Sequence, residues 1–228
     1  DTEASIDDSG GISPTGSYEF GGAAGSSFLD LGAVFSVDFK RHFLTEGFFP
    51  SDLFDARGLI DDITDFDGTT ALDVNAEMQI AVTQDNPGSG SPTYTAFQTF
   101  ANGTYKGRGF KFKANLISND IGQDIKVSQL GYTASLQRRT EQGNVIASGA
   151  GAKAVTFTNP FFVGTSSLLG ANTNLPSVGI NAQNMASGDY FEVSSISGTG
   201  FTVHFKNSSN ASIDRNFTYQ AVGFGKGG

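Results

Sequence analysis

The chain has 228 residues and a mass of 23.9 kDa, and 38% of its residues are hydrophobic, so it can form one large or two small globular domains. Only 16% of the residues are charged, whereas 30 glycines and 21 phenylalanines are present, a composition typical of sheets joined by glycine turns. With no cysteine and 2 histidines, the sequence excludes disulfides, thiolate zinc sites, cysteine nucleophiles and metal sites built from several histidines. We therefore expect a folded, mostly β protein.

The net charge of −9 is distributed unevenly. Residues 1–85 carry 17 acidic and 3 basic side chains, residues 86–144 carry 3 and 7, and residues 145–228 carry 3 and 4. This balance argues against a general phosphate-binding surface. The shift in acidity predicts a separate domain at the end of the chain.

The start of the chain is the most polar part of the sequence. Residues 1–27 are rich in Asp, Ser and Gly and predict an extended lead-in. No signal-peptide pattern and no run of about 18 apolar residues, enough to span a membrane, is present. Because the chain also begins with Asp1, we interpret it as a processed product or as a segment of a longer polypeptide.

Residues 28–142 are predicted to form the first β domain. Apolar and polar residues alternate most clearly over 72–83, and at helical spacing these apolar side chains would scatter around the axis. In the stretch 125–136 the phase slips between Val127 and Leu130, which predicts a β-bulge beside Gly131. Further strands are predicted at 28–40, 94–100 and 109–117. A helical turn is allowed only within 51–59.

Residues 143–228 are predicted to form a second, smaller β domain. Gly143, Asn144 and the small residues of 147–151 place the boundary after residue 142. Five short strands follow, at 154–158, 177–182, 190–196, 201–206 and 216–223. The predicted fold class is all-β, with two antiparallel β-sandwich domains, jelly-roll or lectin-like, in tandem.

Ordered motifs in the second domain resemble the H-type lectin module. They are Val155-Thr156-Phe157, Asn159-Pro160-Phe161, Leu175-Pro176-Ser177-Val178, the segment Thr199–Phe205 and the segment Asn216–Gly223. The resemblance implies a six-stranded antiparallel sandwich that assembles as a trimer and binds sugars at its rim. The chain departs from the family in having Asn207-Ser208-Ser209-Asn210 at the sugar-binding place and no Trp, so the fold carries over better than the sugar site.

A longer stretch, about 28–226, is similar to the C-terminal region of host-specificity proteins at the tail tip, or central tail fibre, of tailed bacteriophages. The segments that carry this resemblance are Asp61–Gly68, Tyr105–Phe112 and Arg215–Lys226. They are structural aromatics and glycines, and they include no catalytic motif. The resemblance implies a virion-tail location outside the host cell and other tail proteins as partners.

A run of acidic residues invites a calcium hypothesis, because Ca²⁺ binds several carboxylate oxygens that converge from a loop. The candidate ligands are Asp61, Asp62, Asp65 and Asp67. With Gly68 at the sixth position of an EF-hand loop only Asp65 and Asp67 fit, so a solvated acidic loop is the main alternative. No other cofactor is expected.

The sequence favours a protein without enzymatic activity. His42 and His204 each lie in a strand-like stretch, and no Gly-x-Ser-x-Gly motif presents a nucleophile. The cations and aromatics of 105–113 alternate with the period of a strand, so Phe110 and Phe112 are expected in the core and nucleic acid is not expected as a partner.

The leading hypothesis is a structural and receptor-binding tail segment that recognises a bacterial surface glycan or an outer-membrane receptor, without inserting into the membrane, as a homotrimer. Amides and aromatic rings in surface loops suit sugars. The candidate contacts are Asn181, Gln183, Asn184, Asp189, Tyr190, Asn207 and Asn210. We expect Asn207 and Asn210 to be replaceable at little cost in stability. An extracellular bacterial adhesin, a filament subunit or a carbohydrate-binding accessory module of a glycan-active enzyme remains the alternative.

Overall fold

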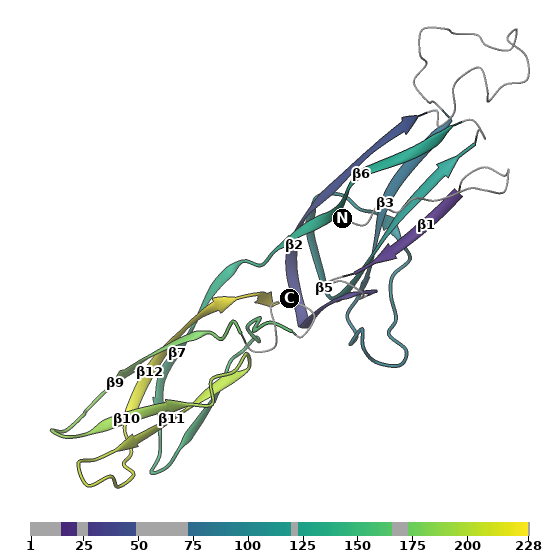
Figure 1. Ribbon diagram of the computed structural model, residues 1–228. Helices are drawn as coiled ribbons and strands as arrows, with labels where there is room; N and C mark the ends of the chain where they lie inside the picture. The colour runs from purple at the N-terminus through teal and green to yellow at the C-terminus, as the bar shows by residue number, and fades with distance from the viewer. Residues whose placement is uncertain (1–14, 22–26, 49–72, 120–122, 166–172, 228) are drawn as a thin grey trace, which may run out of the picture.

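The computed structural model describes residues 15–21, 27–48, 73–119, 123–165 and 173–227. These residues form strands and no helix, and every strand pair is antiparallel, which confirms the all-β prediction. Two regions lie end to end in an elongated molecule (Figure 1). The finer description as two jelly-roll sandwiches stays a prediction. The possible helical turn at 51–59 lies outside the described residues.

The first region is one sheet of seven strands among the described residues, in the order β13-β2-β5-β3-β4, with β1 beside β5 and β6 beside β2. Its strands are β1 (Thr15–Phe20), β2 (Leu29–Phe48), β3 (Val74–Thr83), β4 (Gln98–Thr99), β5 (Gly103–Ser118), β6 (Asp124–Ser135) and β13 (Lys226–Gly227). The long β2 pairs with β5 over its first part and with β6 from Asp38 to Phe48. It therefore joins two halves of one sheet.

An aromatic core fills the first region. Phe39 of β2 packs edge-to-face on Phe110 and Phe112 of β5, with ring centroids 5.0 and 5.6 Å apart. Phe112 also stacks on Tyr132 of β6 at 4.1 Å, so β5 and β6 meet through their side chains. Phe110 and Phe112 are fully buried, as their alternation in the sequence predicts.

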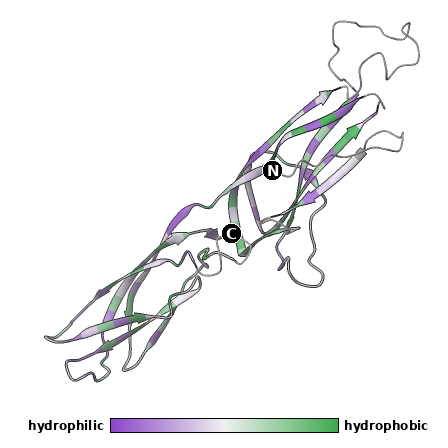
Figure 2. Ribbon diagram, viewed as in Figure 1, coloured by the Kyte–Doolittle hydropathy of each residue, from purple (hydrophilic) through white to green (hydrophobic). Residues whose placement is uncertain are grey.

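The second region contains two three-stranded sheets, β7-β12-β9 and β10-β11-β8. Their strands are β7 (Arg138–Ala147), β8 (Lys153–Thr156), β9 (Ser177–Ala182), β10 (Tyr190–Ser194), β11 (Gly200–Lys206) and β12 (Asn216–Phe224). Alternate residues of β11 and β12 form the core, as the sequence predicts: Phe201, Val203, Phe205, Phe217 and Tyr219 are all buried. Figure 2 shows the hydrophobic and hydrophilic residues alternating along the strands.

The end of the chain ties the second region to the first. After β12, Lys226 and Gly227 pair with β2, and Phe162 forms a β-bridge to Phe224. Phe162 belongs to the first core, where its ring lies edge-on to Phe35 at 6.0 Å. Gly225 has φ +94°, and a Cβ there would lie 2.7 Å from the Phe35 ring. Only glycine accommodates this close approach.

In the first region the structure confirms one detail of the sequence prediction and corrects two strands. The phase slip after Val127 is confirmed, because the register between β2 and β6 skips Ser128 between Val127 and Gln129. β1 lies within the predicted lead-in, and the stretch predicted as a strand at 94–100 pairs only at Gln98–Thr99. There Tyr94 and Phe97 instead lie under the ammonium groups of Lys111 and Lys113.

The predicted boundary after residue 142 falls inside β7, which pairs with β12 from Arg138 to Ala147. Sequence periodicity misses this strand because its less exposed positions hold charged groups. Arg139 Nη1 lies 2.9 Å from Glu141 Oε2, and Glu141 accepts a hydrogen bond from the Thr158 amide at 2.6 Å. Charged groups that are paired in this way can occupy the inward-facing positions of a strand, which usually hold apolar residues.

Candidate functional site

Three strand connections meet at the end of the second region that is remote from the first (Figure 1). They are residues 148–152 between β7 and β8, residues 183–189 between β9 and β10, and residues 207–215 between β11 and β12. We call these three connections the tip. The antiparallel order brings them together, because the strand that leads into one connection ends beside the point where a neighbouring strand begins after another connection.

An ion pair joins two of the tip connections. Oδ2 of Asp189 accepts hydrogen bonds from Arg215 Nε at 3.0 Å, from Arg215 Nη2 at 2.6 Å and from the Ala186 amide at 2.8 Å. These groups leave the Asp189 side chain 4% exposed, so its partners cover it near the molecular surface. The Ala186 amide, together with the Arg215 guanidinium, holds the pKa of Asp189 below its usual value.

A second carboxylate joins the remaining connection. Asp214 Oδ1 accepts hydrogen bonds from the Gly149 amide at 2.7 Å and from the Ser148 hydroxyl at 3.3 Å. The Ser148 Oγ in turn accepts the Arg215 amide at 2.9 Å, and the Ser148 amide donates to the Arg215 carbonyl at 3.0 Å. The three tip connections are therefore fixed to one another by side chains and not only by the sheets behind them.

Asn207 supports the loop that it begins. Its Oδ1 accepts the amides of Ser209 and Ala211 at 3.0 and 2.9 Å, and its backbone amide donates to the Ala211 carbonyl. Asn207 is partly buried and forms an Asx-type turn. Asn207 is therefore less exposed than a free recognition residue would be, and because its side chain holds the turn we now expect its replacement to cost stability.

Asn210 of the tip and Tyr190, the first residue of β10, form an accessible polar pair. Asn210 is exposed, and its Oδ1 accepts a hydrogen bond from the Tyr190 hydroxyl at 2.6 Å. Tyr190 is 38% exposed. Asn210 has φ +61°, so replacement by alanine would also strain the backbone, which the sequence expectation does not take into account.

The other predicted contacts lie around the same end. Asn184 is exposed with φ +57°, and Gln183 donates its backbone amide to the Asn216 carbonyl. Asn181 is exposed near the end of β9, opposite Thr218. The fold therefore brings the seven predicted residues to one end of the second region, where Asp189 and Asn207 support the loops and the others present polar groups.

Sequence reasoning missed Ser148, Asp214 and Arg215, which hold the tip together. A signal was present, because residues 145–228 contain only 3 acidic and 4 basic side chains. In the structure these sparse charges pair, Asp189 with Arg215 and Glu192 with Lys206 at 2.8 Å. In a segment poor in charge, each charged residue is a candidate for such a pair.

The described residues provide no assembled metal site, since no group of three or more His, Asp or Glu side chains could hold an ion there. The candidate calcium ligands Asp61, Asp62, Asp65 and Asp67 lie outside the described residues. His42 and His204 lie on strands, each 2.8 Å from a hydroxyl oxygen, those of Thr133 and Ser212. No helix in the described part of the chain is long and apolar enough to cross a membrane.

Comparison with known proteins found no matching family model, no similar curated protein and no similar solved structure.

Proposed function

We propose that this chain is a non-enzymatic structural and receptor-binding segment of a phage tail tip or tail fibre, and that its tip binds a glycan on the bacterial surface. The observation that supports this most is the fixing of three loops by Asp189, Arg215 and Asp214. Loops held in one conformation lose little entropy when a ligand binds.

The chemistry of the tip favours a sugar. Exposed amides at Asn184 and Asn210 offer donors and acceptors side by side, and the Tyr190 ring beside Asn210 offers a face for the apolar side of a pyranose. Phe191, on the following position of β10, is also 39% exposed. A weak single site of this kind gains strength when several copies bind one surface.

We also propose that the functional unit is a homotrimer, joined to other tail proteins. Repetition of one tip around a threefold axis would give the several copies that a glycan-coated cell can engage together. Light scattering at micromolar concentration measures the mass directly. A mass three times that of the chain is expected, and a monomer would contradict this part of the proposal.

The receptor proposal is tested with variants that remove amides without straining the backbone. Asn184 and Asn210 both have positive φ, so Asn184→Gly and Asn210→Gly keep the conformation and lose the side chain. Ser195 has φ +51° and lies between β10 and β11, at the opposite end of the same region, so Ser195→Gly is the matched control.

Binding of each variant to bacterial cells and to an array of bacterial glycans is the measurement. We expect at least a tenfold loss for the double variant Asn184→Gly/Asn210→Gly, about 1.4 kcal/mol of binding free energy, and no loss for Ser195→Gly. If the unchanged chain, the double variant and Ser195→Gly bound equally well, the tip would not be the recognition site. Release of sugar from the array by the chain would contradict the non-enzymatic assignment.

A further inference from the structure

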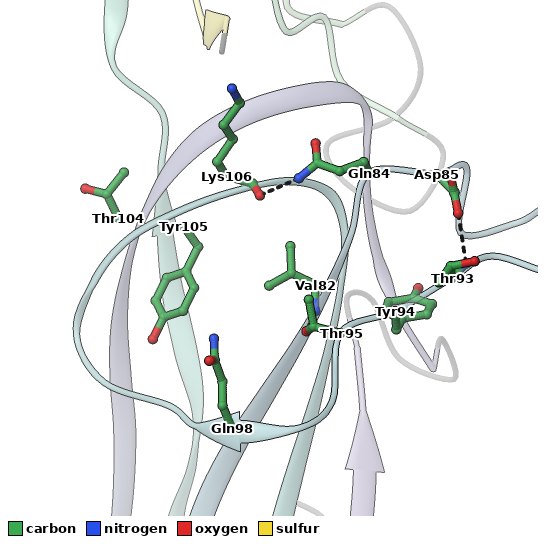
Figure 3. A pocket seen from close by; sticks show the side chains of 10 residues that line it. All are labelled: Val82, Gln84, Asp85, Thr93, Tyr94, Thr95, Gln98, Thr104, Tyr105 and Lys106. Atoms are coloured by element: carbon green, nitrogen blue, oxygen red, sulfur yellow. Dashed lines mark hydrogen bonds between the residues drawn. The ribbon is translucent and has the colours of Figure 1, made fainter.

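A second candidate binding site lies in the first region, away from the tip. The chain between β3 and β4, residues 84–97, lines with β5 a cavity of about 710 Å³ that is open to solvent (Figure 3). Ligand sites in proteins commonly measure about 300–1,000 Å³. The cavity is thus large enough for a small molecule.

The cavity presents free polar groups beside an aromatic ring. In Figure 3 the Gln98 amide points into a space that has the Tyr105 ring on one side and Val82 and Thr95 on the other. Gln98 is exposed, and among the described residues its side-chain amide has no hydrogen-bond partner, so it is free to bind a ligand. The Tyr105 ring is held in place because its hydroxyl donates to the Ala101 carbonyl at 2.9 Å.

The wall of the cavity is formed before any ligand binds. Thr95 exchanges two hydrogen bonds with Val82: its amide donates to the Val82 carbonyl at 2.9 Å, and its hydroxyl oxygen accepts the Val82 amide at 3.0 Å. Gln84 Nε2 donates to the Lys106 carbonyl at 2.9 Å, which ties the start of the loop to β5. The Gln84 Oε1 remains available as an acceptor beside this bond.

Tyr94 adds a buried polar group at the same cavity. Its hydroxyl oxygen is buried and has no hydrogen-bond partner in the described part of the chain. Burial, with the negative charge of Asp30, raises the pKa of Tyr94 to about 12, so the phenol stays protonated at neutral pH. Because this oxygen is buried, Tyr94 contributes to the cavity as a lining residue and not as a hydrogen-bond partner for a ligand.

We propose that this cavity is a second site, for a small uncharged saccharide, independent of the tip. Amides and hydroxyls pair with sugar hydroxyls, and the Tyr105 ring provides the flat apolar face that packs on a pyranose. The cavity carries one acidic and one basic side chain, Asp85 and Lys106, so no net charge selects an ion. Asp85 is also engaged, because its Oδ2 accepts the Thr93 amide at 2.9 Å.

The test is a titration of the whole ¹⁵N-labelled chain with glucose, galactose and N-acetylglucosamine, followed by amide NMR. We expect at least one sugar to shift the amides of Val82, Thr95, Gln98 and Tyr105 with a Kd of about 1 mM. Gln98→Ala should raise this Kd about tenfold or more.

Gln129→Ala is the matched control, because Gln129 is an exposed glutamine on β6 of the same region and does not line the cavity. It should bind as the unchanged chain does. Absence of shifts at the cavity amides up to about 50 mM of each sugar, roughly 50 times the expected Kd, would overturn the proposal. Unchanged affinity of Gln98→Ala would overturn it as well. Asn184→Gly/Asn210→Gly should leave cavity binding intact, so failure of either site is distinguished from failure of the other.

Discussion

The two regions hold their surface loops by different means. At the tip, the loops belong to separate strand connections, and charged side chains join them, with Asp189 on Arg215 and Asp214 on Gly149. In the first region, residues 84–97 form one connection between β3 and β4. It is held by hydrogen bonds of the Thr95 amide and hydroxyl with the Val82 backbone, and by the rings of Tyr94 and Phe97 under Lys111 and Lys113. Charged contacts between separate loops therefore fix the tip, whereas contacts with the adjacent strands β3 and β5 fix residues 84–97.

The hydrophobic cores of the two regions also differ in how many strands support them. The first core is spread over one continuous sheet in which β2 is shared, so loss of one side chain leaves many neighbours. The second core lies between two small sheets, and β11 and β12 supply most of its large side chains. The second region should consequently be the more vulnerable to a single substitution.

The largest effect is expected from Phe201→Ala. Phe201 is 3% exposed and packs on Tyr219 with ring centroids 5.2 Å apart, so its loss opens a cavity worth about 3–5 kcal/mol. We expect amide hydrogen exchange to show the second region unfolded and the β3–β5 pairing of the first region still protected. Val145→Ala is the control, because Val145 is 59% exposed and should change stability by no more than about 0.5 kcal/mol. Simultaneous loss of both regions would contradict two separately stabilised cores.

Gly225→Ala should have the next largest effect, because it acts where the regions join. A Cβ at φ +94° and 2.7 Å from the Phe35 ring forces either strain or displacement, at a cost of about 1–3 kcal/mol. We expect pairing of β13 with β2 to be lost, which small-angle scattering would detect as a wider range of angles between the regions. Gly151→Ala is the control, since nothing lies within 4 Å of a Cβ there. An unchanged scattering curve for Gly225→Ala would show that the other contacts between the regions, such as the Phe162–Phe224 bridge, are sufficient to join them.

The sequence predicts strands well where side chains alternate without paired charges. β9 has the predicted bounds, 177–182, and the bulge in β6 lies where the phase slips after Val127. β7 is not predicted because the ion pair of Arg139 and Glu141 occupies its less exposed positions, where a hydrophobic pattern would need apolar residues. The strand at 94–100 was overpredicted because Tyr94 and Phe97 pack on lysines of β5 without joining the ladder.

For the candidate sites, too, local composition could be read from the sequence, whereas contacts between distant residues could not. Loops rich in Asn could be found from composition, and the fold brings them to one end. The support they receive could not be found, because the contact between Asp189 and Arg215 joins residues 26 positions apart. The cavity in the first region depends on the path of residues 84–97 over β5, which no local pattern encodes.

Asn207→Ala should destabilise the second region by about 1 kcal/mol, because two backbone amides lose their acceptor. Asn207→Asp keeps that acceptor and should retain most of the stability. Chemical denaturation of the two variants measures the difference. If Asn207→Ala were as stable as the unchanged chain, the Asx turn would contribute nothing to stability, and the contacts of Asp189 and Asp214 would be sufficient to hold the tip.

The smallest effect is expected from acid, and it distinguishes covered from exposed charges. The pKa of Asp189 is lowered in the folded chain, so its contribution to stability is present above the unfolded value near 3.8 and is lost as pH falls through the folded pKa. The pKa of Glu192 is lowered too, chiefly by its hydrogen bond to Lys206, but its side chain is 55% exposed and such pairs contribute little to stability.

Melting temperatures between pH 5 and pH 2, about the range over which carboxylates titrate, should therefore fall less steeply in Asp189→Asn than in the unchanged chain. Glu192→Gln should follow the unchanged chain. If Glu192→Gln flattened the profile as much as Asp189→Asn does, the covering of Asp189 by Arg215 and Ala186 would have no energetic consequence, and the tip would be no better fixed than any surface loop.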